Sequence, residues 1–114
     1  MDKNQLREET IEFAVLVADM CDEINGCSVY KNQIIRSSSS IGANLFEAKY
    51  AQSKLDFINK LEIALKESSE TEYWIELLYR KHKLSDDVYK KLKNECGSIR
   101  RKLISSVTTS KNDN

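Results

Sequence analysis

The chain has 114 residues, no proline, three glycines, 32% charged side chains and a formal net charge of zero. This length predicts a single domain, and the composition favours long helices because helix interiors exclude proline and disfavour glycine. A neutral chain has no global field that would draw it to nucleic acid or anionic lipid, and it has no run of about 18 apolar residues that could cross a bilayer.

The cysteines and the N-terminal residues indicate a reducing compartment. Cys21, Cys27 and Cys96 form no CxxC pair, so the sequence indicates neither a disulfide framework nor a zinc site. The first residues lack the apolar core of a signal peptide. We therefore expect reduced thiols in a cytoplasmic protein without a membrane partner.

The first predicted helix occupies the N-terminal quarter of the chain. Its apolar side chains recur at steps of seven, four, three and four residues, which places them on one stripe of a helix. Gly26 can adopt a left-handed conformation without a Cβ clash, so we expect a turn at residues 25–28. The stripe consists of Leu6, Phe13, Val17, Met20 and Ile24.

The run of serines at 37–40 belongs to a second predicted helix and not to a linker. Serine fits a helix by bonding its hydroxyl to the carbonyl four residues earlier, and its small size lets a neighbouring helix come close. We interpret the run as a packing strip, while a ligand or phosphate site stays open as an alternative. On a helical wheel for residues 34–51, the core face carries Ile34, Ser38, Ile41, Leu45 and Ala48.

Two longer helices are predicted in the second half of the chain. Ser53, followed by Asp56, resembles a capping box and starts a helix that extends to about Lys83. Ser85, followed by two aspartates, starts a fourth helix whose apolar stripe ends at Val107.

Four amphipathic segments joined by short turns predict an all-α fold, an up-down-up-down antiparallel four-helix bundle. The bundle domain is expected over residues 1–108, with a flexible polar tail over 109–114. The second and third helices also carry apolar side chains outside their core stripes, and an outward tryptophan is among them. We expect these side chains to form a subunit interface, with the candidates Ile35, Gly42, Phe46, Ile63, Trp74 and Leu77.

No catalytic or metal motif is recognisable. A di-metal site in a helical bundle needs Glu-x-x-His, but the one histidine, His82, follows Tyr79 at that spacing. No Gly-Lys-Ser/Thr phosphate loop occurs. Carboxylates at Glu47, Glu67 and Glu70 could form an acid–base pair, but charges on secondary stripes are more often solvated or paired. We expect a protein that is not an enzyme and binds no metal or cofactor.

Charge is distributed unevenly along the chain. Residues 1–28 hold seven acidic and two basic side chains, whereas residues 84–114 hold four acidic and seven basic ones. Either the first and last helices are adjacent and neutralise each other within one chain, or subunits do so across an interface, or the fourth helix presents a basic surface to RNA or DNA; all three stay open. The nucleic-acid candidates are Lys90, Lys91, Lys93, Arg100, Arg101 and Lys102.

Two stretches resemble one known family. They read QIIRSSSSIGANLFEA from Gln33 and SKLDFINKLEIALKESSETEYWIELL from Ser53. They resemble the four-helix bundle proteins related to the S23-type family, members of which are encoded in intervening sequences of bacterial 23S ribosomal RNA genes. The resemblance covers about residues 5–105. Polar positions that match the family pattern are Ser40, Asn44, Glu47, Glu67, Glu70 and Tyr73.

The resemblance implies a left-turning bundle that assembles into a homo-oligomeric ring, a homopentamer in well-known relatives. It implies no enzyme activity, so a scaffold or interaction module is the expected role. A similar fold serves as a nucleic-acid-binding accessory protein in diversity-generating retroelements, which keeps that alternative open. A carrier of a small ligand in the ring's central opening is a third. We interpret Asn44 as a residue that fixes the register between helices, because a buried amide needs partners.

Overall fold

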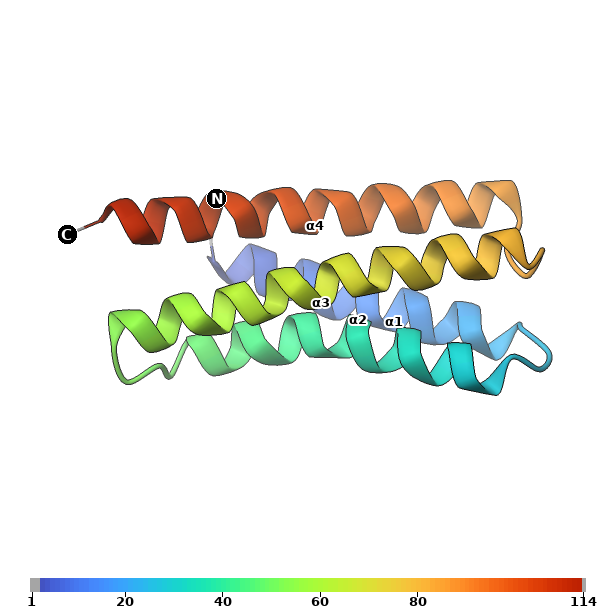
Figure 1. Cartoon of the computed structure of the whole chain (residues 1–114), viewed down its shortest axis with the longest axis horizontal. Helices are drawn as coiled ribbons and strands as arrows, with labels where there is room; N and C mark the ends of the chain where they lie inside the picture. The colour runs from blue at the N-terminus through green and yellow to red at the C-terminus, as the bar shows by residue number, and fades with distance from the viewer. Residues whose placement is uncertain (1–2, 114) are drawn as a thin grey trace.

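Every regular element in the described part of the chain is a helix. The computed structural model describes residues 3–113, with the helices α1 (Lys3–Asp22), α2 (Ser28–Ala48), α3 (Lys54–Arg80) and α4 (Asp86–Asn112). Each helix packs along the next one in the chain, and α4 also packs against α1 (Figure 1). The molecule is elongated, 48 × 21 × 19 Å, and the all-α prediction is confirmed.

The three connections alternate between the two ends of the molecule. Figure 1 shows the α2–α3 connection at the end where α1 begins and α4 finishes, and the other two connections at the opposite end. Each connection spans five residues, which reach at most about 18 Å, whereas the 20 residues of α1 extend about 30 Å. A connection this short cannot run back along the length of a helix. Each helix therefore begins close to the point where the previous one ends, and the two lie side by side.

The predicted apolar stripes meet in one core. Leu6, Phe13 and Val17 of α1 are buried, as is Ile24 in the turn that follows, and Met20 packs against this core while partly exposed. Burying each large aliphatic side chain contributes about 1.5–3 kcal/mol before entropy is subtracted. The largest fully buried apolar side chains are Phe13, Val17, Ile34, Ile41, Ile75, Leu78, Leu92, Ile99 and Leu103.

Side chains and one left-handed residue define the helix ends. The Ser53 and Ser85 hydroxyls accept hydrogen bonds from the backbone N–H groups of Asp56 and Val88, at 3.0 and 3.2 Å, as predicted. His82 has a φ of 60° and closes α3, because its N–H and that of the next residue bond back to carbonyls in the last turn. The lone histidine therefore ends a helix.

Several predicted boundaries are wrong by a few residues. The first turn covers residues 23–27, because Gly26 and Cys27 are both left-handed and α2 already begins at Ser28. The third helix ends at Arg80, before the left-handed His82. The fourth helix continues to Asn112, through residues expected to form a flexible tail. Residues 1–2 and 114, which belong to the predicted domain and tail, lie outside the described residues.

Candidate protein interface

The serine run lies inside α2, where it allows close helix packing. Ser37 and Ser38 are buried, Ser40 is half-buried and Ser39 is exposed. The two buried hydroxyls donate to the carbonyls of Ile34 and Ile35, three residues earlier and not four as predicted. The packing interpretation of the run agrees with this burial.

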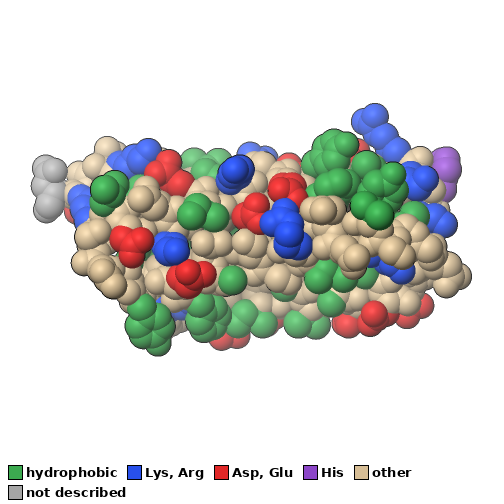
Figure 2. Space-filling model, turned by 60° about the horizontal axis from the view of Figure 1, so that its bottom comes forward, with side chains coloured by type: hydrophobic (Ala, Val, Ile, Leu, Met, Phe, Trp, Pro, Cys, Tyr) green, Lys and Arg blue, Asp and Glu red, His purple; other side chains and the backbone are tan. Residues whose placement is uncertain are grey.

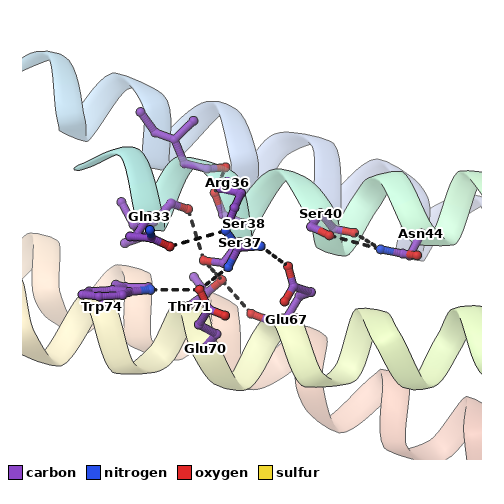
Figure 3. Close-up of polar contacts among 12 residues, drawn as sticks. Gln33, Arg36, Ser37, Ser38, Ser40, Asn44, Glu67, Glu70, Thr71 and Trp74 are labelled. Carbon is purple, nitrogen blue, oxygen red and sulfur yellow. Dashed lines mark hydrogen bonds and ion pairs between the residues drawn. The ribbon is translucent and has the colours of Figure 1, made fainter. Parts of the chain in front are cut away.

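A polar seam joins α2 to α3 beside the serine run (Figure 3). The Thr71 hydroxyl donates to Ser37 Oγ over 2.8 Å, in a fully buried position. Arg36 forms ion pairs with Glu67, at 2.7 Å, and with Glu70. The indole N–H of Trp74 donates to the same Glu70 carboxylate over 3.1 Å. These contacts fix the register of α2 against α3.

The contacts of the seam favour the ionised form of Glu70. The hydrogen bond from Trp74, followed by those from Arg36, lowers the pKa of Glu70 below its ordinary value. Hydrogen bonds to Glu70 and Glu67 raise the pKa of Arg36. One oxygen of each of these carboxylates accepts from Arg36, and that of Glu70 also accepts from Trp74. Glu67 and Glu70, considered from the sequence as an acid–base pair, therefore belong to an ion-pair network.

Asn44, predicted to fix the register between helices, makes its hydrogen bonds within α2. Asn44 is buried, and its amide donates to the Ser40 carbonyl and hydroxyl, at 2.8 and 3.1 Å, within its own helix. The contacts between helices come instead from neighbouring positions. Glu47 pairs with Lys60 of α3 at 3.1 Å, and Tyr73 is 59% exposed.

An open apolar groove follows the line where α1 and α2 meet. Val15 of α1 is 53% exposed and Phe46 of α2 is 45% exposed, while Ile11 and Ile35 are each more than a third exposed. The groove has a volume of about 290 Å³. We call it the α1–α2 groove; its lining is Thr10, Ile11, Ala14, Val15, Ala18, Ser39, Gly42, Ala43 and Phe46.

Two of the three predicted interface residues of α2 line this groove. Phe46 is exposed there, and Gly42 is buried at its floor, where an added Cβ would lie 3.0 Å from Thr10 Oγ1. Ile35 is exposed on α2 but does not line the groove. Gly42 therefore sets how closely α1 approaches α2. The contribution of α1 was missed from the sequence, although Ile11 and Val15 stand four residues apart and off the core stripe.

The predicted interface residues of α3 lie on a different face. Ile63 is 44% exposed, whereas Leu77 is half-buried. Trp74, expected to face outward, is partly buried; it packs edge-on to Tyr73 at 5.0 Å and lies 6.0 Å from Tyr30. Tyr73 takes the outward position. We call Ile63, Tyr73 and Leu77 the α3 strip.

Half of the basic residues predicted for nucleic-acid binding form ion pairs within the chain. Lys102 contacts Glu9 of α1 at 2.6 Å, Arg100 contacts Glu72 at 2.5 Å, and Lys93 contacts Glu76 at 3.7 Å. Thus α1 neutralises one of these basic side chains of α4, and α3 neutralises the other two. Lys90, Lys91 and Arg101 are exposed and make no ion pair within residues 3–113.

Two other kinds of site are absent from the described residues. No group of three or more His, Cys, Asp or Glu side chains is placed to hold a metal ion within residues 3–113. Among the described helices, none is long and apolar enough to span a membrane.

Comparison with known proteins identifies the family. The model of the 23S rRNA-intervening sequence protein family matches residues 2–105. The fold is also similar to the crystal structure of a protein of unknown function from the S23 ribosomal protein family of Bacteroides thetaiotaomicron. That similarity has a TM-score of 0.89 and 42% sequence identity, and it covers 95% of this chain and 99% of the other. A comparison with curated proteins found no match.

The chain is thus a four-helix protein with exposed apolar side chains along the α1–α2 groove and the α3 strip. It belongs to the 23S rRNA-intervening sequence protein family, as the resemblance of the serine-rich helix and the following helix predicted.

Proposed function

We propose that this protein is a non-enzymatic, cytoplasmic scaffold or interaction module that works as a homo-oligomer. The alternating connections support an up-down-up-down antiparallel bundle as its building block. The observation that carries the proposal is the α1–α2 groove, where Val15 and Phe46 are about half exposed on a single chain. Contiguous apolar surface of this kind marks an interface, because leaving it in water is costly.

A closed ring is the assembly we propose, with five subunits as the resemblance implies. The mass of one chain is 13.1 kDa, so a pentamer has a mass of about 65 kDa. Sedimentation velocity and light scattering at micromolar concentration test the proposal directly. A single species of 13.1 kDa under these conditions would rule it out.

Nucleic-acid binding is a second candidate, favoured by the unpaired cations of α4. Lys90 and Arg101 lie on one outward stripe of α4, about 16 Å apart at 1.5 Å per residue. A ring would repeat this pair around its axis and bind a polyanion at several points.

The test is fluorescence anisotropy with single-stranded DNA and structured RNA at low and moderate salt. Binding that is lost in Lys90→Glu/Arg101→Glu supports a role in nucleic-acid recognition. The absence of binding at low salt removes it.

A further inference from the structure

Two different apolar faces are exposed on one chain, the α1–α2 groove and the α3 strip. Figure 2 shows apolar side chains along the lower edge of the molecule with acidic ones beside them, and a second apolar group at the upper right beside basic ones. Two distinct faces permit a head-to-tail contact, in which each copy offers one face to each neighbour. A self-complementary contact would need only one of them.

The charges around the two faces are opposite. The groove is bordered along α1 by exposed acidic side chains that form no ion pair within residues 3–113. These are Glu8, Glu12, Asp19 and Asp22. Around the α3 strip, Lys66, Arg80 and Lys81 are exposed, whereas the nearby carboxylates are already paired, Glu70 with Arg36 and Glu76 with Arg80 at 3.7 Å. Within residues 3–113, the charges beside the strip that form no ion pair are therefore those of Lys66 and Lys81. Such complementarity favours one orientation of a second copy.

The two faces also match in height along the bundle. Val15, Ile35 and Tyr73 each lie seven residues from the end of their helix at the α3–α4 connection, about 10 Å along the axis. Farther from the α3–α4 connection, Phe46 lies 18 residues from the start of α2, and Ile63 lies 17 residues from the end of α3. Two copies standing side by side with parallel axes would therefore bring these apolar groups to the same level.

Arg80 falls at the same level as Asp22, since each is the last residue of its helix at that end. With parallel axes, the same placement of two copies brings both the apolar side chains and the charged residues of the two faces to matching levels. An antiparallel arrangement would place Phe46 opposite Tyr73 and separate the basic residues from the acidic end.

We propose that the α3 strip of one copy packs into the α1–α2 groove of the next, head to tail and with parallel bundle axes. The inference rests on the self-association proposed above and identifies the two surfaces that meet. Because each added copy leaves one free groove and one free strip, the contact continues until the assembly closes or extends as a filament.

Complementation between two defective variants tests the pairing. Val15→Glu places a charge in the groove, and Tyr73→Glu places one on the strip; both side chains are more than half exposed, so the fold is retained. Circular dichroism checks this, and Phe46→Glu serves as a second groove variant. Matched controls are Val29→Glu on α2 and Leu55→Glu on α3, which are 68% and 69% exposed and lie outside both faces.

Sedimentation velocity should give monomers for Val15→Glu and for Tyr73→Glu, and wild-type assemblies for both controls. An equimolar mixture of the two variants should give a dimer of about 26 kDa, twice the 13.1 kDa chain, because one intact groove meets one intact strip. If Tyr73→Glu assembles like the wild type, the strip is not the occupant of the groove, although self-association stands. If the wild type itself is monomeric, both proposals fail.

Discussion

At the scale of single residues, the most informative contacts are those of Glu70. This carboxylate receives the Trp74 indole and the Arg36 guanidinium, one from its own helix and one from α2. It is part of the link between α2 and α3, and its charge is therefore coupled to the stability of that link. Trp74 is the single tryptophan of the chain, so its fluorescence reports on this position.

The lowered pKa of Glu70 predicts a specific acid sensitivity. A carboxylate with a lowered folded pKa contributes stability above its ordinary value of 4.5, and this contribution disappears as the pH falls through the folded value. Unfolding in urea between about pH 6 and pH 3 should show a smaller loss of stability for Glu70→Gln than for the wild type. Glu95→Gln on α4 is the control. Equal pH dependence in all three proteins would contradict the prediction.

The three thiols should differ sharply in reactivity. Burial, followed by the nearby Glu72 carboxylate, raises the pKa of Cys96 to about 12, and its Sγ lies 3.4 Å from the Ser68 carbonyl. At pH 8 only about one Cys96 in ten thousand is then a thiolate. Burial also raises the pKa of Cys21, whereas Cys27 is half-buried in the α1–α2 turn.

Reaction with a thiol-specific chromogenic reagent at pH 8 should show one fast thiol in the folded protein and three in urea. The fast phase should be absent in Cys27→Ser. A fast phase that persists in that variant would show that a buried thiol is accessible.

At the scale of helices, the spacing between α1 and α2 depends on one glycine. Gly42 faces Thr10, whose fully buried hydroxyl donates to the Arg7 carbonyl over 2.7 Å and so is held in place. Gly97 of α4 faces the movable end of the Arg101 side chain at 3.2 Å. The two helical glycines thus have neighbours of very different rigidity.

Alanine at these positions should change stability in opposite directions. Gly97→Ala should stabilise the protein by about 0.5–1 kcal/mol, the usual gain in helix propensity. Gly42→Ala gains the same propensity but forces its Cβ against Thr10, an overpacking cost of about 1–3 kcal/mol, so a net loss of about 1 kcal/mol is expected. Urea unfolding measures both. A stabilising Gly42→Ala would show that α1 can move away freely.

At the scale of the whole molecule, the core ends before the chain does. Val107 is the last buried residue of α4, and the helical residues after it are exposed except for partly buried Ser110. One ion pair, Lys111 with Glu62 at 3.5 Å, ties this last segment to α3, and both side chains are about half exposed.

Removal of residues 109–114 should therefore change the free energy of unfolding by no more than about 0.5 kcal/mol, the usual contribution of a surface ion pair. A longer deletion, of residues 103–114, also removes buried Leu103 and Val107 and should cost several kcal/mol, since each large core truncation costs about 2–5 kcal/mol. Thermal and urea melts compare the two. A large loss from the shorter deletion would place the last helical turns within the stable domain.

Much of the fold could be predicted because its signals are local. The apolar stripes of the four helices repeat every three or four residues, and the Ser53 and Ser85 caps act within three residues of themselves. The wrong helix boundaries also have a local cause, the conformation of single residues. Left-handed Cys27 precedes the start of α2 and left-handed His82 follows the end of α3, and the side-chain pattern gives no warning of either, since residues other than glycine seldom adopt that conformation.

The candidate interface was predicted less completely, because exposure depends on which helices become neighbours. Periodicity in the sequence established the helices, their buried stripes and the presence of surplus apolar side chains. It could not distinguish exposed Phe46 from buried Gly42, or outward Tyr73 from packed Trp74. Packing of α1 beside α2 turned separate side chains into one groove, and packing of α3 beside α4 paired Arg100 with Glu72. Burial and ion pairing join residues distant in the chain, so they follow from the arrangement of helices in space.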